Sequence, residues 1–148
     1  MAQFRALIVE DNKDYCRFLQ LTLQEKTQCQ VIGQASDGLE AIRQAEEVQP
    51  DLILLDIGLP RLNGIAAACR IRQVAPNSKI LFVSQNSSIE IVEAVLRAGA
   101  HGYLLKSDAI ELPTAVATVL QGKQFVSASL RDHDCMAVND KSTATTSP

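Results

Sequence analysis

The chain has 148 residues, of which 47% are hydrophobic, and a formal net charge of -3. These values indicate one globular domain that can bury a core without disulfides or a structural metal. The charge argues against nucleic-acid binding by this chain, because contacts to phosphate groups need a basic face. The apolar runs are too short to cross a bilayer, so we expect a cytoplasmic protein without a membrane association. The four cysteines lack a metal-binding spacing and suit a reducing compartment.

Short apolar runs alternate with segments of helical periodicity along most of the chain. The apolar runs predict strands at residues 4–9, 30–35, 51–55, 79–83 and 102–105. The periodic segments predict helices at 13–26, 38–48, 64–73, 88–98 and 110–121. Three signals mark helix ends: Pro50, the capping-box spacing from Ser87 to Glu90, and Gly99. Five successive β–α units predict a parallel sheet with right-handed crossovers and helices on both faces.

The pattern fades after Gly122. The stretch from Arg131 to Pro148 is polar, rich in Ser, Thr and Asp, and has no apolar period. We therefore predict a folded domain at residues 1–125 and a polar, disordered C-terminal tail at 126–148.

Polar residues directly follow four of the five predicted strands. Glu10 and Asp11 follow the first strand, Asp56 the third, Ser84 the fourth and Lys106 the fifth. Because ligands bind at the carboxyl ends of the strands in an open α/β sheet, we expect these side chains to share one pocket. Clustered carboxylates favour a hard cation such as Mg²⁺ or Mn²⁺. A carboxylate can also attack phosphorus, while an ammonium and a hydroxyl stabilise the phosphoryl oxygens.

These residues resemble the receiver domain of bacterial two-component response regulators, and the similarity extends over about residues 4–122. The matching elements are the acid pair Glu10-Asp11, the loop Asp56-Ile-Gly-Leu-Pro-Arg-Leu-Asn-Gly64, Ser84, and Ala98-Gly-Ala-His-Gly-Tyr-Leu-Leu-Lys106. The resemblance implies a flavodoxin-like, five-stranded parallel sheet of order 2-1-3-4-5. It implies a phosphoacceptor signalling domain whose only reactions are its own phosphorylation and dephosphorylation.

The resemblance also assigns roles around the acid cluster. Asp56 would accept phosphate from a sensor histidine kinase or a phosphotransfer protein. Asp11 and Asp56 would coordinate Mg²⁺ together with the backbone carbonyl of Gly58, and Glu10 would act through a metal-bound water. Lys106 would contact the phosphoryl group.

A second group of residues would transmit the signal. By the same resemblance, Ser84 moves toward the phosphoryl group and Tyr103 swings inward as a switch aromatic. The face formed by residues 88–121 would then bind a partner or form a homodimer. The segment 98–120 also resembles regulators that carry a LuxR-type helix-turn-helix, but this chain shows no such DNA-binding domain. Both a stand-alone receiver and a piece of a longer protein remain open.

Three other functions share features with this pattern. A phosphatase of the haloacid-dehalogenase type needs a second acid two residues after the nucleophile, where this chain has Gly58. A flavodoxin-like cofactor binder needs a phosphate loop after the first strand, where Glu10 and Asp11 would repel phosphate. An interaction module that works without phosphorylation is the third alternative. Finally, Gln85 follows Ser84 where the family usually has a small residue, and it predicts slow labelling by small phosphodonors.

Overall fold

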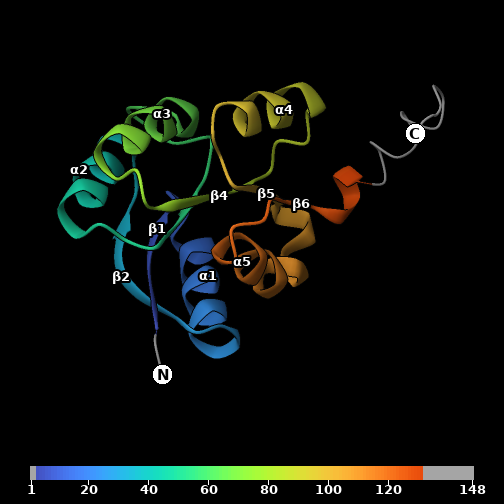
Figure 1. Cartoon of the computed structure of the whole chain (residues 1–148), viewed down its shortest axis with the longest axis horizontal. Helices are drawn as coiled ribbons and strands as arrows, with labels where there is room; N and C mark the ends of the chain where they lie inside the picture. Colours follow the sequence, from blue (N-terminus) through green and yellow to red (C-terminus); the bar gives the residue numbers. More distant parts are fainter. Residues whose placement is uncertain (1–2, 132–148) are drawn as a thin grey trace.

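The computed structural model describes residues 3–131, which form a parallel sheet between two layers of helices (Figure 1). The strands are β1 (Phe4–Val9), β2 (Cys29–Ala35), β3 (Leu52–Leu55), β4 (Lys79–Ser84), β5 (Gly102–Leu105) and β6 (Phe125–Val126). The helices are α1 (Lys13–Lys26), α2 (Gly38–Val48), α3 (Gly64–Val74), α4 (Ile89–Arg97), the 3-10 helix η1 (Lys106–Glu111) and α5 (Leu112–Leu120). The strands pair in parallel in the order β2-β1-β3-β4-β5-β6. The predicted doubly wound sheet is confirmed, with a sixth strand added at its edge.

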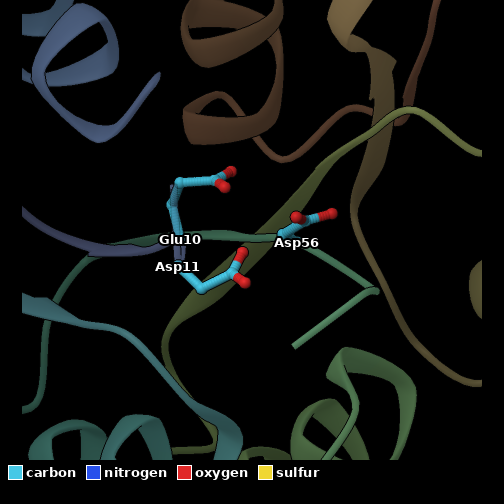
Figure 2. Close-up of side chains that lie close together, drawn as sticks. All are labelled: Glu10, Asp11 and Asp56. Atoms are coloured by element: carbon cyan, nitrogen blue, oxygen red, sulfur yellow. The ribbon is translucent and has the colours of Figure 1, made fainter. Parts of the chain in front are cut away.

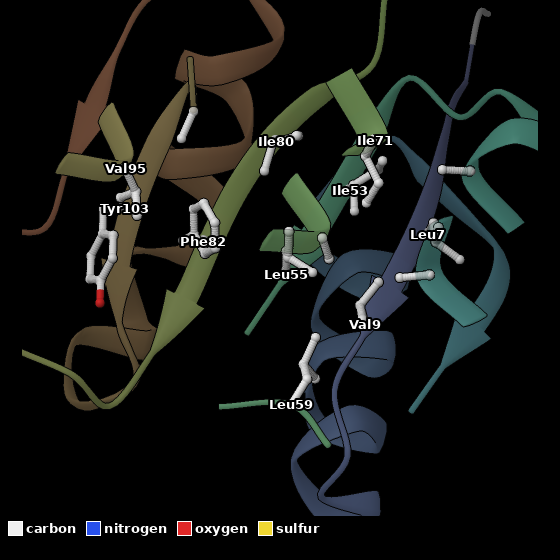
Figure 3. Close-up of a cluster of buried hydrophobic side chains, with 14 of the residues drawn as sticks. Leu7, Val9, Ile53, Leu55, Leu59, Ile71, Ile80, Phe82, Val95 and Tyr103 are labelled. Carbon is white, nitrogen blue, oxygen red and sulfur yellow. The ribbon is translucent and has the colours of Figure 1, made fainter. Parts of the chain in front are cut away.

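The central strands are apolar because both faces of the sheet are covered. In β1, Leu7 and Val9 belong to one hydrophobic cluster, and Ala6 and Ile8 belong to the other. The first cluster, part of which is drawn in Figure 3, is closed by α2, α3 and α4, and the second is closed by α1 and α5. None of the helices in the described part of the chain is long and apolar enough to cross a bilayer.

The helix ends follow the predicted signals with two adjustments. Helix α4 is capped by Ser88, whose Oγ accepts a backbone N–H of the first turn at 3.4 Å, so the capping box predicted from Ser87 lies one residue too early. Gly99 adopts a φ of 111° just after α4, as a left-handed helix stop does. The last predicted helix is divided, because η1 precedes α5. Helix α5 begins at Leu112, and Pro113 lies in its first turn, where its missing N–H removes no hydrogen bond.

The C-terminal boundary differs from the prediction. The sequence predicts a disordered tail over residues 126–148, but residues 126–131 are part of the folded structure. After β6, Ser127 and Leu130 are buried, and residues 128–131 form a helical turn. A strand of two residues has no periodicity that a sequence pattern could reveal. The rest of the predicted tail, residues 132–148, lies outside the described residues.

Candidate functional site

Three carboxylates meet at the carboxyl ends of β1 and β3, as the strand-end pattern predicts. Figure 2 shows Glu10 and Asp11 leaving the end of β1 beside Asp56, which follows β3. Each acid offers one oxygen, and these oxygens lie within 4.8 Å of one another. The backbone N–H of Asp56 donates to the Val9 carbonyl at 3.1 Å, which fixes the two strand ends side by side. Glu10 and Asp56 are buried, at 4% and 8% exposure, whereas Asp11 is exposed.

Lys106 supplies the positive charge of the site. Its Nζ lies 2.9 Å from Glu10 Oε1 and 3.3 Å from Asp56 Oδ2. Burial raises the pKa of Glu10, although hydrogen bonds to Lys106 and to the Asn12 backbone oppose this shift. Burial lowers the pKa of Lys106, but the two carboxylates outweigh this effect, so the pKa of the ammonium is raised. Lys106 therefore stays charged between the two acids at neutral pH.

The donor set fits a hard divalent cation. Only oxygen ligands converge here, which is the set that Mg²⁺ and Mn²⁺ prefer. Glu10 Oε1 is buried and, apart from the ammonium contact, has no hydrogen-bond partner among residues 3–131. An acceptor of this kind can take a metal-bound water as a donor.

Ser84 and Tyr103 are joined through Asn86, a link that the sequence analysis missed. The Asn86 N–H donates to Ser84 Oγ at 3.1 Å, and the Tyr103 hydroxyl donates to the Asn86 carbonyl at 2.7 Å. Tyr103 points inward: it is fully buried, and its ring stacks on Phe82 at a centroid distance of 6.1 Å. Burial raises the pKa of Tyr103, so its hydroxyl remains a donor. Asparagine in a loop after a strand gives no sequence signal that distinguishes this role from an ordinary turn.

An open cavity of about 610 Å³ lies over these groups. Its lining includes the predicted acids, Ser84 and Lys106, together with Gly58, Gln85 and Asn86. Gln85 is exposed, as expected for a side chain at the entrance. A side chain at Gly58 would meet no atom within 4 Å, so this position borders open space. The structure thus brings the predicted acids, hydroxyl and ammonium into one pocket, while Tyr103 lies behind it.

Tyr15 also belongs to this site, although the sequence analysis did not include it. The Lys106 Nζ lies over the Tyr15 ring, 4.6 Å from its centroid. The sequence signal for this contact is weak, because an aromatic residue in the first turn of a helix is usually a packing residue. Its proximity to Lys106 depends on the fold, which brings α1 next to the end of β5.

A doubly wound parallel sheet with an acid pocket at its carboxyl edge is typical of a phosphoacceptor signalling domain. Residues 6–117 match the family described as the response regulator receiver domain, and the chain belongs to this family. Receiver domains of this family interact with histidine kinases and bind a divalent metal at an acidic pocket. The phosphatase, cofactor-binding and phosphorylation-independent alternatives are not favoured.

Two similar curated proteins are transcriptional regulatory proteins. The chain is 33% identical over 125 residues to the transcriptional regulatory protein DegU of Brevibacillus brevis, an alignment covering 84% of this chain and 53% of that protein. It is 34% identical over 120 residues to the transcriptional regulatory protein LiaR of Bacillus subtilis, covering 80% and 57%. The chain therefore spans little more than half the length of these two relatives.

Solved structures support the same assignment. A LuxR-family two-component response regulator from Aurantimonas sp. SI85-9A1 superimposes with a TM-score of 0.86 at 27% identity, covering 92% of this chain and 98% of the other. The receiver domain of the putative response regulator NarL from Mycobacterium tuberculosis gives a TM-score of 0.78 at 27% identity, covering 83% and 100%.

Proposed function

We propose that Asp56 is the phosphoacceptor of this receiver domain. The observation that carries the proposal is the position of Asp56, whose carboxylate lies 3.3 Å from the Lys106 ammonium and beside two further acids. No other aspartate in the described part of the chain has this combination of a buried carboxylate, a lysine contact and an acid cluster.

The proposed reaction is an in-line transfer from a phosphohistidine. One carboxylate oxygen of Asp56 attacks phosphorus, so an O–P bond forms as the N–P bond breaks, and the departing imidazole nitrogen retains the electron pair and takes a proton. The Lys106 ammonium, already beside Asp56, would contact an oxygen of the transferred group. A sensor histidine kinase or a phosphotransfer protein would be the donor.

The residues that would hold Mg²⁺ or Mn²⁺ are Asp11, Asp56 and the backbone carbonyl of Gly58, with Glu10 acting through a water. When bound, the cation supplies positive charge that offsets the repulsion between the carboxylates and the phosphoryl group. Asp11 suits direct binding because it is exposed to the cavity side. Glu10 suits an indirect contact because Oε2 already accepts the Asn12 N–H at 3.0 Å.

The proposed switch acts through Asn86. If the Ser84 hydroxyl turns to the phosphoryl group as a donor, its contact with the Asn86 N–H is weakened, and Asn86 also holds the Tyr103 hydroxyl. A change at Ser84 would therefore reach the face of α4, β5 and α5, within residues 88–121. We propose this face as the surface for partner binding or homodimerisation.

The test is Mg²⁺-dependent labelling with acetyl phosphate, read by intact-protein mass and by peptide mapping. We expect wild type to gain one phosphoryl group on the peptide containing Asp56, and Asp56→Asn to gain none. Asp14→Asn, which changes an exposed aspartate on α1, is the matched control and should label like wild type. Labelling of Asp56→Asn at the wild-type rate would overturn the proposal.

A further inference from the structure

Three groups surround the Lys106 ammonium. Two are the carboxylates of Glu10 and Asp56, and the third is the face of the Tyr15 ring, 4.6 Å from Nζ. An ammonium over the face of an aromatic ring is attracted by the ring quadrupole, and the attraction grows when the site excludes water. The Lys106 side chain is only 13% exposed, so the contact is largely desolvated.

The Tyr15 ring is held in place from both ends of the residue. Its backbone N–H donates to the side chain of Asn12, the N-cap of α1, at 2.8 Å. Its ring packs against the Phe18 ring at a centroid distance of 5.3 Å. Because Asn12 directly follows the acid pair, the helix cap sets the ring at a constant position relative to the cluster.

The Tyr15 hydroxyl does not contribute to this placement. It is buried and has no hydrogen-bond partner among residues 3–131. Burial, together with the charges of Glu10 and Asp56, raises the pKa of Tyr15 to about 12, so the ring stays neutral. A neutral ring can hold a cation without adding to the negative charge of the pocket.

We infer that Tyr15 is a positioning residue whose ring holds the Lys106 ammonium against Asp56, and that it thereby sets the rate of phosphoryl transfer. This inference rests on the proposed function of Asp56. Without the ring, the two carboxylates still attract Lys106, but the side of the ammonium that the ring covers is open to solvent and the lysine gains other rotamers. The oxygens of the incoming group would then meet a less ordered cation.

The first test compares labelling by acetyl phosphate in Tyr15→Phe and Tyr15→Leu. Phe keeps the ring, so Tyr15→Phe should keep most of the wild-type rate, whereas Tyr15→Leu should label roughly three- to tenfold more slowly, the range expected for loss of a cation–π contact. In the Lys106→Met background, Tyr15→Leu should cause no further loss, since the group that the ring positions is absent. Equal losses in both backgrounds would show a general structural effect and overturn the inference.

The second test needs no phosphorylation. In protein labelled with ¹³C-lysine, the ε-methylene protons of Lys106 should be shifted upfield by the Tyr15 ring current, and the Lys106→Met variant identifies their signal. The upfield shift should persist in Tyr15→Phe and be lost in Tyr15→Leu. An unchanged shift in Tyr15→Leu would overturn the inference. If the shift behaves as expected but wild type is not labelled at Asp56, the proposed phosphoacceptor fails, while the ring contact with Lys106 stands.

Discussion

Replacement of Lys106 by Met should destabilise the fold, and the loss should be larger in mildly alkaline than in mildly acidic solution. Lys106 is the cation that contacts two buried carboxylates, at 2.9 Å from Glu10 and 3.3 Å from Asp56. Methionine retains much of the aliphatic volume but leaves Glu10, at 4% exposure, without its charge partner. The change therefore isolates the charge of the lysine from its packing.

The size of the effect follows from the two distances. At an effective dielectric constant of about 20, each contact is worth roughly 5 to 6 kcal/mol of Coulomb attraction. Dehydration of the ammonium cancels much of this gain, and loss of one partner from a buried pair typically costs about 3 to 5 kcal/mol. Because Glu10 can escape the penalty by taking a proton, we expect about 3 kcal/mol at pH 8.

The pH dependence has a definite sign. The pKa of Glu10 is raised in the folded state, so the folded chain holds this proton more tightly and the contribution of Glu10 becomes more favourable as pH falls. Lys106 is among the groups that lower the pKa of Glu10, so Lys106→Met raises it further. As pH falls below that raised pKa, the free energy of unfolding of the variant should recover by up to about 1.4 kcal/mol per pH unit. The raised pKa of Lys106 keeps its contribution fully present below about pH 10.5, so wild type does not lose it in this range.

Urea unfolding of wild type and Lys106→Met at about pH 8 and pH 5 measures both effects. Lys123→Met, at an exposed position, is the control and should be nearly neutral at both values. A loss below about 1 kcal/mol at pH 8, which is the worth of an exposed ion pair, would refute the reasoning, and so would an equal loss at both pH values. Either result would mean that Glu10 does not depend on the ammonium.

Three further substitutions test the surroundings of the site. Gly64→Ala should lower the free energy of unfolding by about 1 to 3 kcal/mol and slow labelling, because the added Cβ would lie 1.9 Å from the carbonyl oxygen of Asp56. A variant as stable as wild type in urea would contradict this prediction. Arg61 has a φ of 68° and only a loose contact with Asp37, so Arg61→Gly should stay near wild type while Arg61→Val loses about 1 to 2 kcal/mol; equal melting temperatures of the two variants would be the contrary result. Gln85→Ala should label faster with acetyl phosphate because it opens the cavity, and equal rates would remove the idea that Gln85 narrows it.

The sequence predicts the acid cluster well because its geometry follows from a general rule. Strands that are apolar on both faces indicate a parallel sheet that is covered on both sides, and residues that follow such strands converge at one edge of the sheet. Glu10, Asp56 and Lys106 are therefore brought to the same edge of the sheet by its topology. The metal ligands and the phosphoacceptor remain proposals, because their roles concern groups that bind to the site.

Other contacts could not be predicted because they depend on where neighbouring elements pack. Tyr15 follows the helical period of α1, and only the packing of α1 near the end of β5 brings its ring to Lys106. Asn86 lies in a loop whose path is fixed by bonds to Ser84 and Tyr103. Hydrogen bonds of this kind leave no trace in hydrophobic periodicity.

Strand β5 lies between the site and the C-terminal segment, and it is bonded to both. On one side the Tyr103 hydroxyl donates to the Asn86 carbonyl beside the pocket. On the other side the Tyr103 carbonyl accepts the Ser127 N–H at 2.9 Å, and the Leu105 N–H donates to Ser127 Oγ at 3.1 Å. Ser127 is fully buried and its hydroxyl also donates to Asp108 in η1, the helix that begins with Lys106.

Ser127 is therefore hydrogen-bonded both to β5 and to η1, the element that follows β5. A shift of β5 toward the pocket must either carry the segment after β6 with it or break buried hydrogen bonds, and each unpaired buried group costs about 1 to 3 kcal/mol. Moving the segment together with β5 avoids that cost. The residues after β6, which the sequence pattern assigned to a tail, are thus bonded directly to the strand that carries Tyr103.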